Sequence, residues 1–284
     1  MSALRSGIIR PVVITELPCS ASAWIQRVEA TTADAVLGLL SIRVVLGAGL
    51  CPPSPLPPTV HLALAFHGAD PDPANATVYP VVDGAVLIAS VPVPAPWSPW
   101  VVGDRNASLV EVRVLETASG DTIAVRTGIR SLSVDPATAR IQVNGAAVKL
   151  LGYNRHTMWP DSGAAVTPAQ EATDMQLLVA LNANYVRGAH YPQVRGAGAA
   201  WSCGSDGRGA TNAPAPPLQS QSWLDLCDEN GIAMWEEALG PGTTTADLTN
   251  AWYMQNNLAA IQSMATTSIN HPSVILHGFF SASW

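Results

Sequence analysis

Two short apolar runs, each followed by polar side chains, stand out in the second half of the sequence. They are Lys149–His156 and Asn184–Pro192. Between them, Thr167-Pro-Ala-Gln170 has the spacing of a capping box with proline at the first helical position, and Leu177, Leu178 and Leu181 follow at helical intervals. The pattern predicts strand, helix and strand. Because such a crossover connects parallel strands, this part of the chain is predicted to contain a parallel sheet.

The alternation of strand and helix continues further along the chain. Ser222–Gly231 carries apolar residues on one helical face and ends at a glycine, and Ile232–Trp235 is the predicted third strand. Residues 258–270 show helical spacing, and Ser273–Phe280 is the predicted fourth strand. In parallel α/β folds the chemistry lies beyond the carboxyl ends of the strands. The side chains at the first two of these ends are Asn154, Arg155, His156, Arg187 and His190.

The first half of the chain has a different pattern. Residues 12–127 contain short apolar or alternating runs separated by proline, glycine and aspartate, which predicts an antiparallel β-sandwich with one solvated face. The proline-dense segments Cys51–Pro58 and Val91–Pro99 lack backbone donors and are predicted to be loops. Asn144-Gly145 between two apolar runs predicts a hairpin, after which the α/β region begins.

Residues 193–220 differ from their surroundings. They are rich in glycine, alanine and proline without periodicity, which is typical of a loop, although a loop of this length is unusual inside a compact domain. Removal of Val194–Gln219 would restore a short link between a strand and a helix. Our hypothesis is that this atypical insert is a translated intron, and a genuine loop is the alternative.

Composition limits the kind of ligand. The 284 residues include 14 basic and 21 acidic side chains, and the net charge of −7 argues against nucleic acid or an anionic membrane as a partner. The most apolar stretch, residues 35–50, is shorter than the roughly 20 residues of a membrane-spanning helix. Met1–Arg10 does not resemble a signal peptide, and the four cysteines show no metal-ligand spacing. We therefore expect a small neutral or polar ligand, no metal and no cofactor.

A series of short motifs extends through almost the whole chain. They are Gly7–Val12, Trp97–Pro99, Gly128–Arg130, Gly152–His156, Asp161–Gly163, Asn182–Arg187, His190–Pro192, Leu226–Gly231 and Asn270–Leu276. Together they resemble the glycoside hydrolases of family 2, the group of β-galactosidases, β-glucuronidases and β-mannosidases. The resemblance implies a multidomain chain, β and then α/β. Residues 1–11 would be the exit of a sugar-binding domain, 12–127 an immunoglobulin-like β-sandwich, and 128–284 an incomplete TIM (β/α)8 barrel of about four strands.

The resemblance also implies an activity. Family members are retaining O-glycosidases that use one glutamate as general acid/base and another as nucleophile. In this chain Ser281 and Ala282 stand where the family has the Asn-Glu pair of the acid/base, and the nucleophile position would fall beyond residue 284. We therefore expect a β-galactosidase-like chain, truncated at both ends and without glycosidase activity. A non-catalytic carbohydrate-binding or interaction module and a gene-model fragment are the alternatives.

Six residues are the candidates for contacts with the sugar, and each also has a purely structural interpretation. By resemblance, His156 and His190 would hydrogen-bond sugar hydroxyls, although a lone histidine is more often structural. Asn154, Arg155 and Arg187 either orient the substrate or brace the site, and for the arginines we favour the brace. The sixth candidate is Glu237.

The two glutamates at the predicted third strand end are adjacent. Glu236 and Glu237 would face opposite ways on a strand, so they cannot form the roughly 5 Å carboxylate pair of a retaining glycosidase. One of them is predicted to line the pocket. Trp159 and Trp235 are candidates for stacking on a sugar ring, with an ordinary core position as the alternative.

Overall fold

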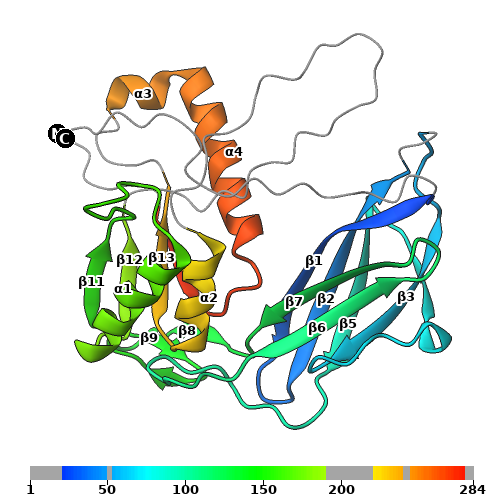
Figure 1. Cartoon of the computed structure of the whole chain (residues 1–284), viewed down its shortest axis with the longest axis horizontal. Helices are drawn as coiled ribbons and strands as arrows, with labels where there is room; N and C mark the ends of the chain where they lie inside the picture. The colour runs from blue at the N-terminus through cyan, green and yellow to red at the C-terminus, as the bar shows by residue number, and fades with distance from the viewer. Residues whose placement is uncertain (1–20, 50–52, 190–219, 239–243, 279–284) are drawn as a thin grey trace. The chain divides into compact units, whose positions relative to one another are not determined.

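The computed structural model describes residues 21–49, 53–189, 220–238 and 244–278 (Figure 1). These residues form two compact units. The β unit comprises residues 21–149 and 269–272, and the α/β unit comprises residues 150–268 and 273–278 within the described ranges. No helix in the described ranges is long and apolar enough to cross a membrane.

The β unit contains two larger antiparallel sheets. Their strand orders are β1-β2-β5 and β4-β3-β6-β7. The strands of the first sheet are β1 (Ala23–Asp34), β2 (Leu39–Ala48) and β5 (Ala85–Pro92). Those of the second are β3 (Thr59–Phe66), β4 (Thr77–Pro80), β6 (Val110–Glu116) and β7 (Asp121–Thr127). A short 3-10 helix, η1 (Pro73–Asn75), precedes β4.

Alternation of apolar and polar residues places one face of each sheet against a shared core. In β2, Leu40, Ile42 and Val44 are fully buried while the residues between them are partly exposed. Val112 and Val114 of β6 pack in the same cluster, which draws on both sheets. The two sheets therefore enclose one apolar core, as the alternating runs predict. The immunoglobulin-like assignment of this unit stays a prediction.

A small third sheet completes the β unit. Its strands, in the order β10-β9-β8, are β8 (Leu132–Val134), β9 (Ile141–Val143) and β10 (Ala146–Ala147). The predicted hairpin at Asn144-Gly145 is confirmed: both residues have positive φ, 52° and 75°, as a tight two-residue hairpin turn requires. The β unit thus extends to Lys149, beyond residue 127 where the predicted β-sandwich ends.

The α/β unit is built on four parallel strands in the order β11-β12-β13-β14. They are β11 (Gly152–Arg155), β12 (Tyr185–Gly188), β13 (Ala233–Glu237) and β14 (Val274–Gly278). The helices between them are α1 (Pro168–Ala180), α2 (Gln221–Glu229), α3 (Thr245–Thr249) and α4 (Ala251–Thr267). The predicted alternation of parallel strands and helices is confirmed for the described residues.

Helix α1 begins where its capping signal predicts. The Thr167 hydroxyl accepts from the Gln170 backbone, the Gln170 side chain accepts from the Thr167 backbone, and Pro168 occupies the first turn. The buried face, however, is formed by Met175 and Leu178. Of the three predicted apolar positions, Leu178 is thus confirmed as buried, whereas Leu177 and Leu181 are 58% and 60% exposed. Successive helical residues are about 100° apart, so Leu177 points away from the face that Leu178 buries.

One apolar layer lies between the strands and the first two helices. Strand residues Val186, Met234 and Val274 pack there against Leu178 of α1 and Trp223 of α2. Cys227 of α2 is also in this layer, and burial raises the pKa of its thiol well above the ordinary value. Since side chains alternate along a strand, the residues next to these apolar ones point to the opposite face of the sheet.

Candidate functional site

The face of the sheet opposite α1 and α2, the inner face, carries polar and aromatic side chains near the carboxyl ends of its strands. They are Asn154, Tyr185, Arg187, Trp235 and Glu237. Register explains their proximity, because Asn154 of β11 is paired with Arg187 of β12, which is paired with Trp235 of β13. Side chains at paired positions of parallel strands point the same way. Strands that are far apart in sequence thus place these polar side chains next to one another.

Arg187 and Glu237 form the centre of this group. Nε of Arg187 donates to Oε2 of Glu237 at 2.6 Å, and Nη2 lies 2.5 Å from the same oxygen. Nη1 of Arg187 also donates to Oδ1 of Asn154 at 3.4 Å. The Glu237 side chain is 0% exposed and that of Arg187 is 21% exposed. The arginine neutralises a buried carboxylate, and charge-assisted hydrogen bonds hold both groups in place.

Tyr185 belongs to the same face and is missing from the sequence-based candidates. It lies two residues before Arg187 on β12, and its register partners are the small residues Gly152 and Ala233. Burial raises the pKa of the half-buried Tyr185 hydroxyl; the Arg187 charge opposes the rise and the Glu237 charge adds to it. The period of two from Arg187 was the signal that could have identified it.

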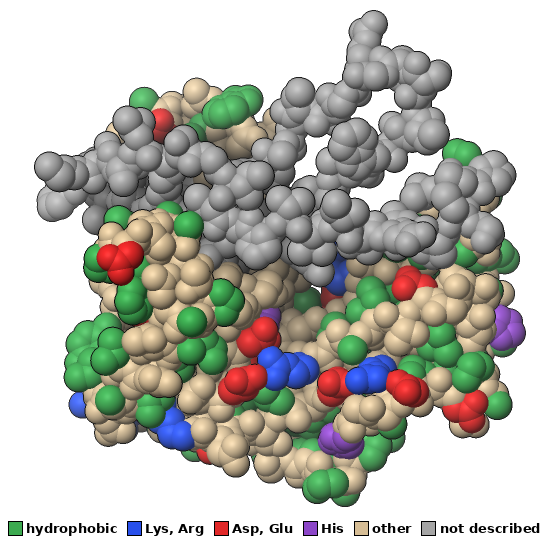
Figure 2. Space-filling view, viewed as in Figure 1, with side chains coloured by type: hydrophobic (Ala, Val, Ile, Leu, Met, Phe, Trp, Pro, Cys, Tyr) green, Lys and Arg blue, Asp and Glu red, His purple; other side chains and the backbone are tan. Residues whose placement is uncertain are grey.

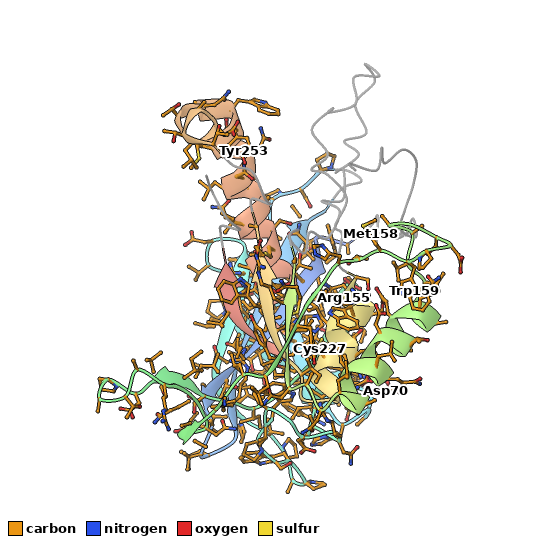
Figure 3. The ribbon with its side chains drawn as sticks, turned by 90° about the vertical axis from the view of Figure 1, so that its left-hand side faces the viewer. Asp70, Arg155, Met158, Trp159, Cys227 and Tyr253 are labelled. Atoms are coloured by element: carbon orange, nitrogen blue, oxygen red, sulfur yellow. The ribbon has the colours of Figure 1, made fainter. Side chains whose placement is uncertain are left out.

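Arg155 is held on the other side of the sheet. Its Nε donates to Oδ2 of Asp174 on α1 at 2.9 Å, and its guanidinium carbon lies 3.8 Å from the centroid of the Trp223 ring. Nη1 donates to the Thr157 hydroxyl at 3.3 Å. Figure 3 shows Arg155 on the side of the strands that carries α1 and α2. These contacts are those of a brace, so Arg155 is not carried forward as a substrate-binding residue.

Glu236 and Glu237 face opposite ways, as their adjacency on a strand predicts. Oε2 of Glu236 lies 3.5 Å from Nδ1 of His277, and the Glu236 side chain is 0% exposed. Burial raises the pKa of Glu236 to about 8; the nearby Ser268 hydroxyl opposes the rise and the Asp228 charge adds to it. Glu237 is the one that belongs to the inner face.

The other sequence-based candidates are placed as follows. His156 follows β11 directly and is exposed, and its backbone oxygen accepts from the Met158 backbone at 2.8 Å. His190 and Ala282 lie outside the described residues. The structure thus brings together Asn154, Arg187 and Glu237.

Comparisons with known proteins connect this fold and site to a family. Residues 135–197 match the model of the glycosyl hydrolases family 2, TIM barrel domain. A β-glucuronidase of Sus scrofa is 23% identical over 278 residues, which cover 95% of this chain and 36% of that protein. A β-galactosidase of Thermoanaerobacter pseudethanolicus is 29% identical over 161 residues, 56% of this chain and 17% of that protein. The chain thus spans about a third of the first relative and about a sixth of the second.

Solved structures agree on the fold. A family 2 β-galacturonidase from Eisenbergiella tayi, bound to galacturonate, superposes with a TM-score of 0.66 at 20% sequence identity. The match covers 93% of this chain and 42% of the galacturonidase chain. A β-glucuronidase of Bifidobacterium dentium, complexed with coumarin-3-O-glucuronide, has a TM-score of 0.69 at 18% sequence identity. The match covers 93% of this chain and 38% of the glucuronidase chain. The matched barrel model, the curated relatives and the shared fold confirm the resemblance to the glycoside hydrolases of family 2 that was drawn from the motifs.

Proposed function

We propose that the inner face of β11–β14 is one wall of a carbohydrate pocket of the β-glycosidase type, with a β-galactosidase-like specificity for β-glycosides. Asn154, Arg187 and Glu237 are its polar floor, and His156 and His190 contribute hydroxyl contacts at the strand ends. The observation that carries the proposal is the hydrogen-bonded trio at the carboxyl ends of parallel strands. The matched barrel domain and the carbohydrate-bound structural relatives support it.

The trio has the properties that recognition of a sugar requires. Glu237 is fully buried, so its charge fixes the Arg187 guanidinium in one orientation. Arg187 keeps a partly exposed side chain, and Asn154 is exposed, so both can offer polar atoms to a ligand. Because the Arg187 and Glu237 charges cancel, the trio suits a neutral polyol better than an anion. A preorganised polar group of this kind binds with little loss of side-chain entropy.

The proposal extends to chemistry and fold. In a retaining β-glycosidase one carboxyl group protonates the leaving oxygen and a second attacks the anomeric carbon. Alanine has no group that can hold or transfer a proton, so with Ala282 at the acid/base position this polypeptide binds sugar without hydrolysing it. We also propose that the β unit is an immunoglobulin-like sandwich and the α/β unit part of a TIM barrel. The fold match over 93% of the chain supports both assignments.

Calorimetric titration of the full chain tests the binding proposal. Methyl β-D-galactopyranoside should bind, and Arg187→Met should weaken binding by about tenfold or more, since a polar contact in a pocket is worth about 1.5–3 kcal/mol when an ionised group is involved. Arg113→Met, which removes an arginine paired with Asp70 and Glu111 in the β unit, is the matched control. Wild-type affinity in Arg187→Met, or loss of binding in Arg113→Met, would contradict the proposed site.

An assay for hydrolysis of nitrophenyl β-glycosides, with the same preparations, tests the proposal that the chain binds sugar without hydrolysing it. We expect release of nitrophenol at the rate of a control without protein. Turnover at the rates of ordinary enzymes, about 1 per second or faster, would show that the chain is a working glycosidase and that the expected lack of activity is wrong.

A further inference from the structure

Trp235 occupies an unusual position on the inner face. It is paired in register with Arg187, while Glu237, two residues later on β13, is paired with Gly278 of β14. A Cβ atom at Gly278 would lie 2.0 Å from Nε1 and 2.5 Å from Cε2 of the Trp235 indole. The indole therefore lies directly on the Gly278 backbone and extends toward the level of Glu237. No residue larger than glycine fits beneath it.

The indole leaves a polar atom unsatisfied. Nε1 of Trp235 is buried and has no hydrogen-bond partner in the described part of the chain. An unpaired buried donor is destabilising, and native structures rarely retain one without a reason. A leucine or phenylalanine would fill part of the same space without this cost. What tryptophan adds is a wide, flat, electron-rich ring.

The surroundings of the ring indicate what such a plane is for. Trp235 is partly exposed, and Arg187 and Glu237 of the polar trio lie at its own register level and at the next inner-face position. Ligand pockets commonly combine an aromatic surface with a few placed polar groups. A pyranose has the complementary shape, because its C–H groups form an apolar face while its hydroxyls project from the rim. A β-galactopyranoside in particular gathers several C–H groups on one face.

We propose that Trp235, supported by Gly278, is the stacking platform of the pocket, and that it selects β-pyranosides that present a C–H face to the indole. This inference rests on the proposed carbohydrate pocket and adds a specificity-determining residue to it. With the sugar ring on the indole, its hydroxyls meet Asn154 and Arg187. The platform contributes contact area and orientation, and the polar trio contributes hydrogen bonds.

The test is titration of the full chain with methyl β-D-galactopyranoside, by calorimetry and by proton NMR of the sugar. Trp235→Leu removes the stacking surface and should weaken binding about tenfold or more. Trp235→Phe keeps a smaller plane and should weaken it about threefold. Gly278→Ala leaves the indole in the chain but displaces it, and should resemble Trp235→Leu. Trp252→Phe on α4, where the side chain is 74% exposed, is the matched control and should bind as the wild type does.

The NMR readout separates stacking from a merely structural role. Ring currents should shift the C–H protons of the bound sugar upfield in the wild type, and this shift should be lost in Trp235→Leu at unchanged melting temperature. If Trp235→Leu does not fold, Trp235→Phe decides the matter. Wild-type affinity in both Trp235 variants would overturn the platform while the pocket stands. If the wild type itself binds no β-pyranoside, the platform and the proposed function both fail.

Discussion

The two units bury ionisable side chains to different extents. In the β unit the shared core is apolar, the buried Glu29 is paired with Arg27 and Arg43, and the buried Glu116 accepts a hydrogen bond from the Ser119 hydroxyl. Figure 2 shows acidic and basic side chains next to one another on the surface. The α/β unit buries ionisable side chains in and beside its sheet. They are Arg155, Glu171, Asp228, Glu236 and Glu237.

This difference indicates which unit is more strongly associated with function. Burial of charge is costly unless each group is paired, whereas apolar packing has no such requirement. The α/β unit buries carboxyl groups on both faces of one sheet: Glu237 is paired with Arg187 on the inner face, and Glu236, whose pKa burial raises to about 8, lies on the helix side. Sites that break the rules of simple packing are where function is expected. The described part of the β unit buries fewer ionisable side chains, and its shared core is apolar.

The largest effect is expected from breaking the buried ion pair. Arg187→Met leaves the fully buried Glu237 without its partner, so the α/β unit should lose about 3–5 kcal/mol of unfolding free energy. Hydrogen exchange measured by mass spectrometry resolves the two units and should show faster exchange in the strands and helices of the α/β unit and unchanged exchange in the β unit. The double variant Arg187→Met/Glu237→Gln removes both charges and should recover most of the loss. Equal destabilisation in the single and double variants would refute the charge argument.

Removal of a buried side chain from the core of the β unit should cause a comparable loss of unfolding free energy in that unit alone. Ile42→Ala removes a fully buried side chain from β2 and should cost about 2–5 kcal/mol. Leu87→Ala on β5, where the side chain is 65% exposed, is the control and should change stability by less than about 0.5 kcal/mol. Sugar binding should persist in both variants under native conditions. Loss of binding in folded Ile42→Ala protein would mean that the units are not separable in this way.

Stability of the α/β unit should depend on pH through Glu236. Burial raises the folded-state pKa to about 8 from an ordinary value of 4.5, so the folded unit binds a proton that the unfolded chain releases. The contribution is fully present below pH 4.5 and is lost as pH rises to about 8, by about 1.4 kcal/mol per pH unit. Denaturant unfolding followed by helical circular dichroism should show this slope. Glu236→Gln should remove it, and an unchanged slope would assign the dependence to another group.

The smallest effect concerns the cap of α1. Thr167→Ala removes the hydroxyl that accepts from the Gln170 backbone and should cost about 1 kcal/mol. Thr173→Ala in the middle of the same helix is the matched control, because its exposed side chain caps nothing and alanine is the better helix former. It should leave the unfolding midpoint unchanged or slightly raised. If both variants behave alike, the cap is not what stabilises the start of α1.

Several features could be predicted from the sequence because their causes are local. The Thr167 capping box, the Asn144-Gly145 hairpin and the opposite orientation of Glu236 and Glu237 each depend on residues within a few positions of one another. The candidate list was less accurate. It included Arg155, whose partners Asp174 and Trp223 hold it on the helix side.

Other features were missed because they depend on distant residues. Tyr185 looked like an ordinary strand residue until the register placed Gly152 and Ala233 beside it. Trp235 was a candidate for stacking on a sugar, but its position on Gly278 followed only from the structure. Of Leu177, Leu178 and Leu181 on α1, Leu178 alone is buried, since helical spacing does not say which side of the helix meets the sheet. These features all concern contacts between elements, which the period of a sequence does not contain.

The sequence by itself determined the order of strands and helices, the parallel connection across α1, and the family resemblance carried by the motifs. Only the tertiary structure decided that Arg187 would meet Glu237, 50 residues further along, and that Trp235 would lie on Gly278. The physical reason is that turns, caps and alternation follow from short-range sterics and hydrogen bonds. Partners on different strands, by contrast, are chosen by sheet register, which depends on how the whole apolar layer packs against the helices.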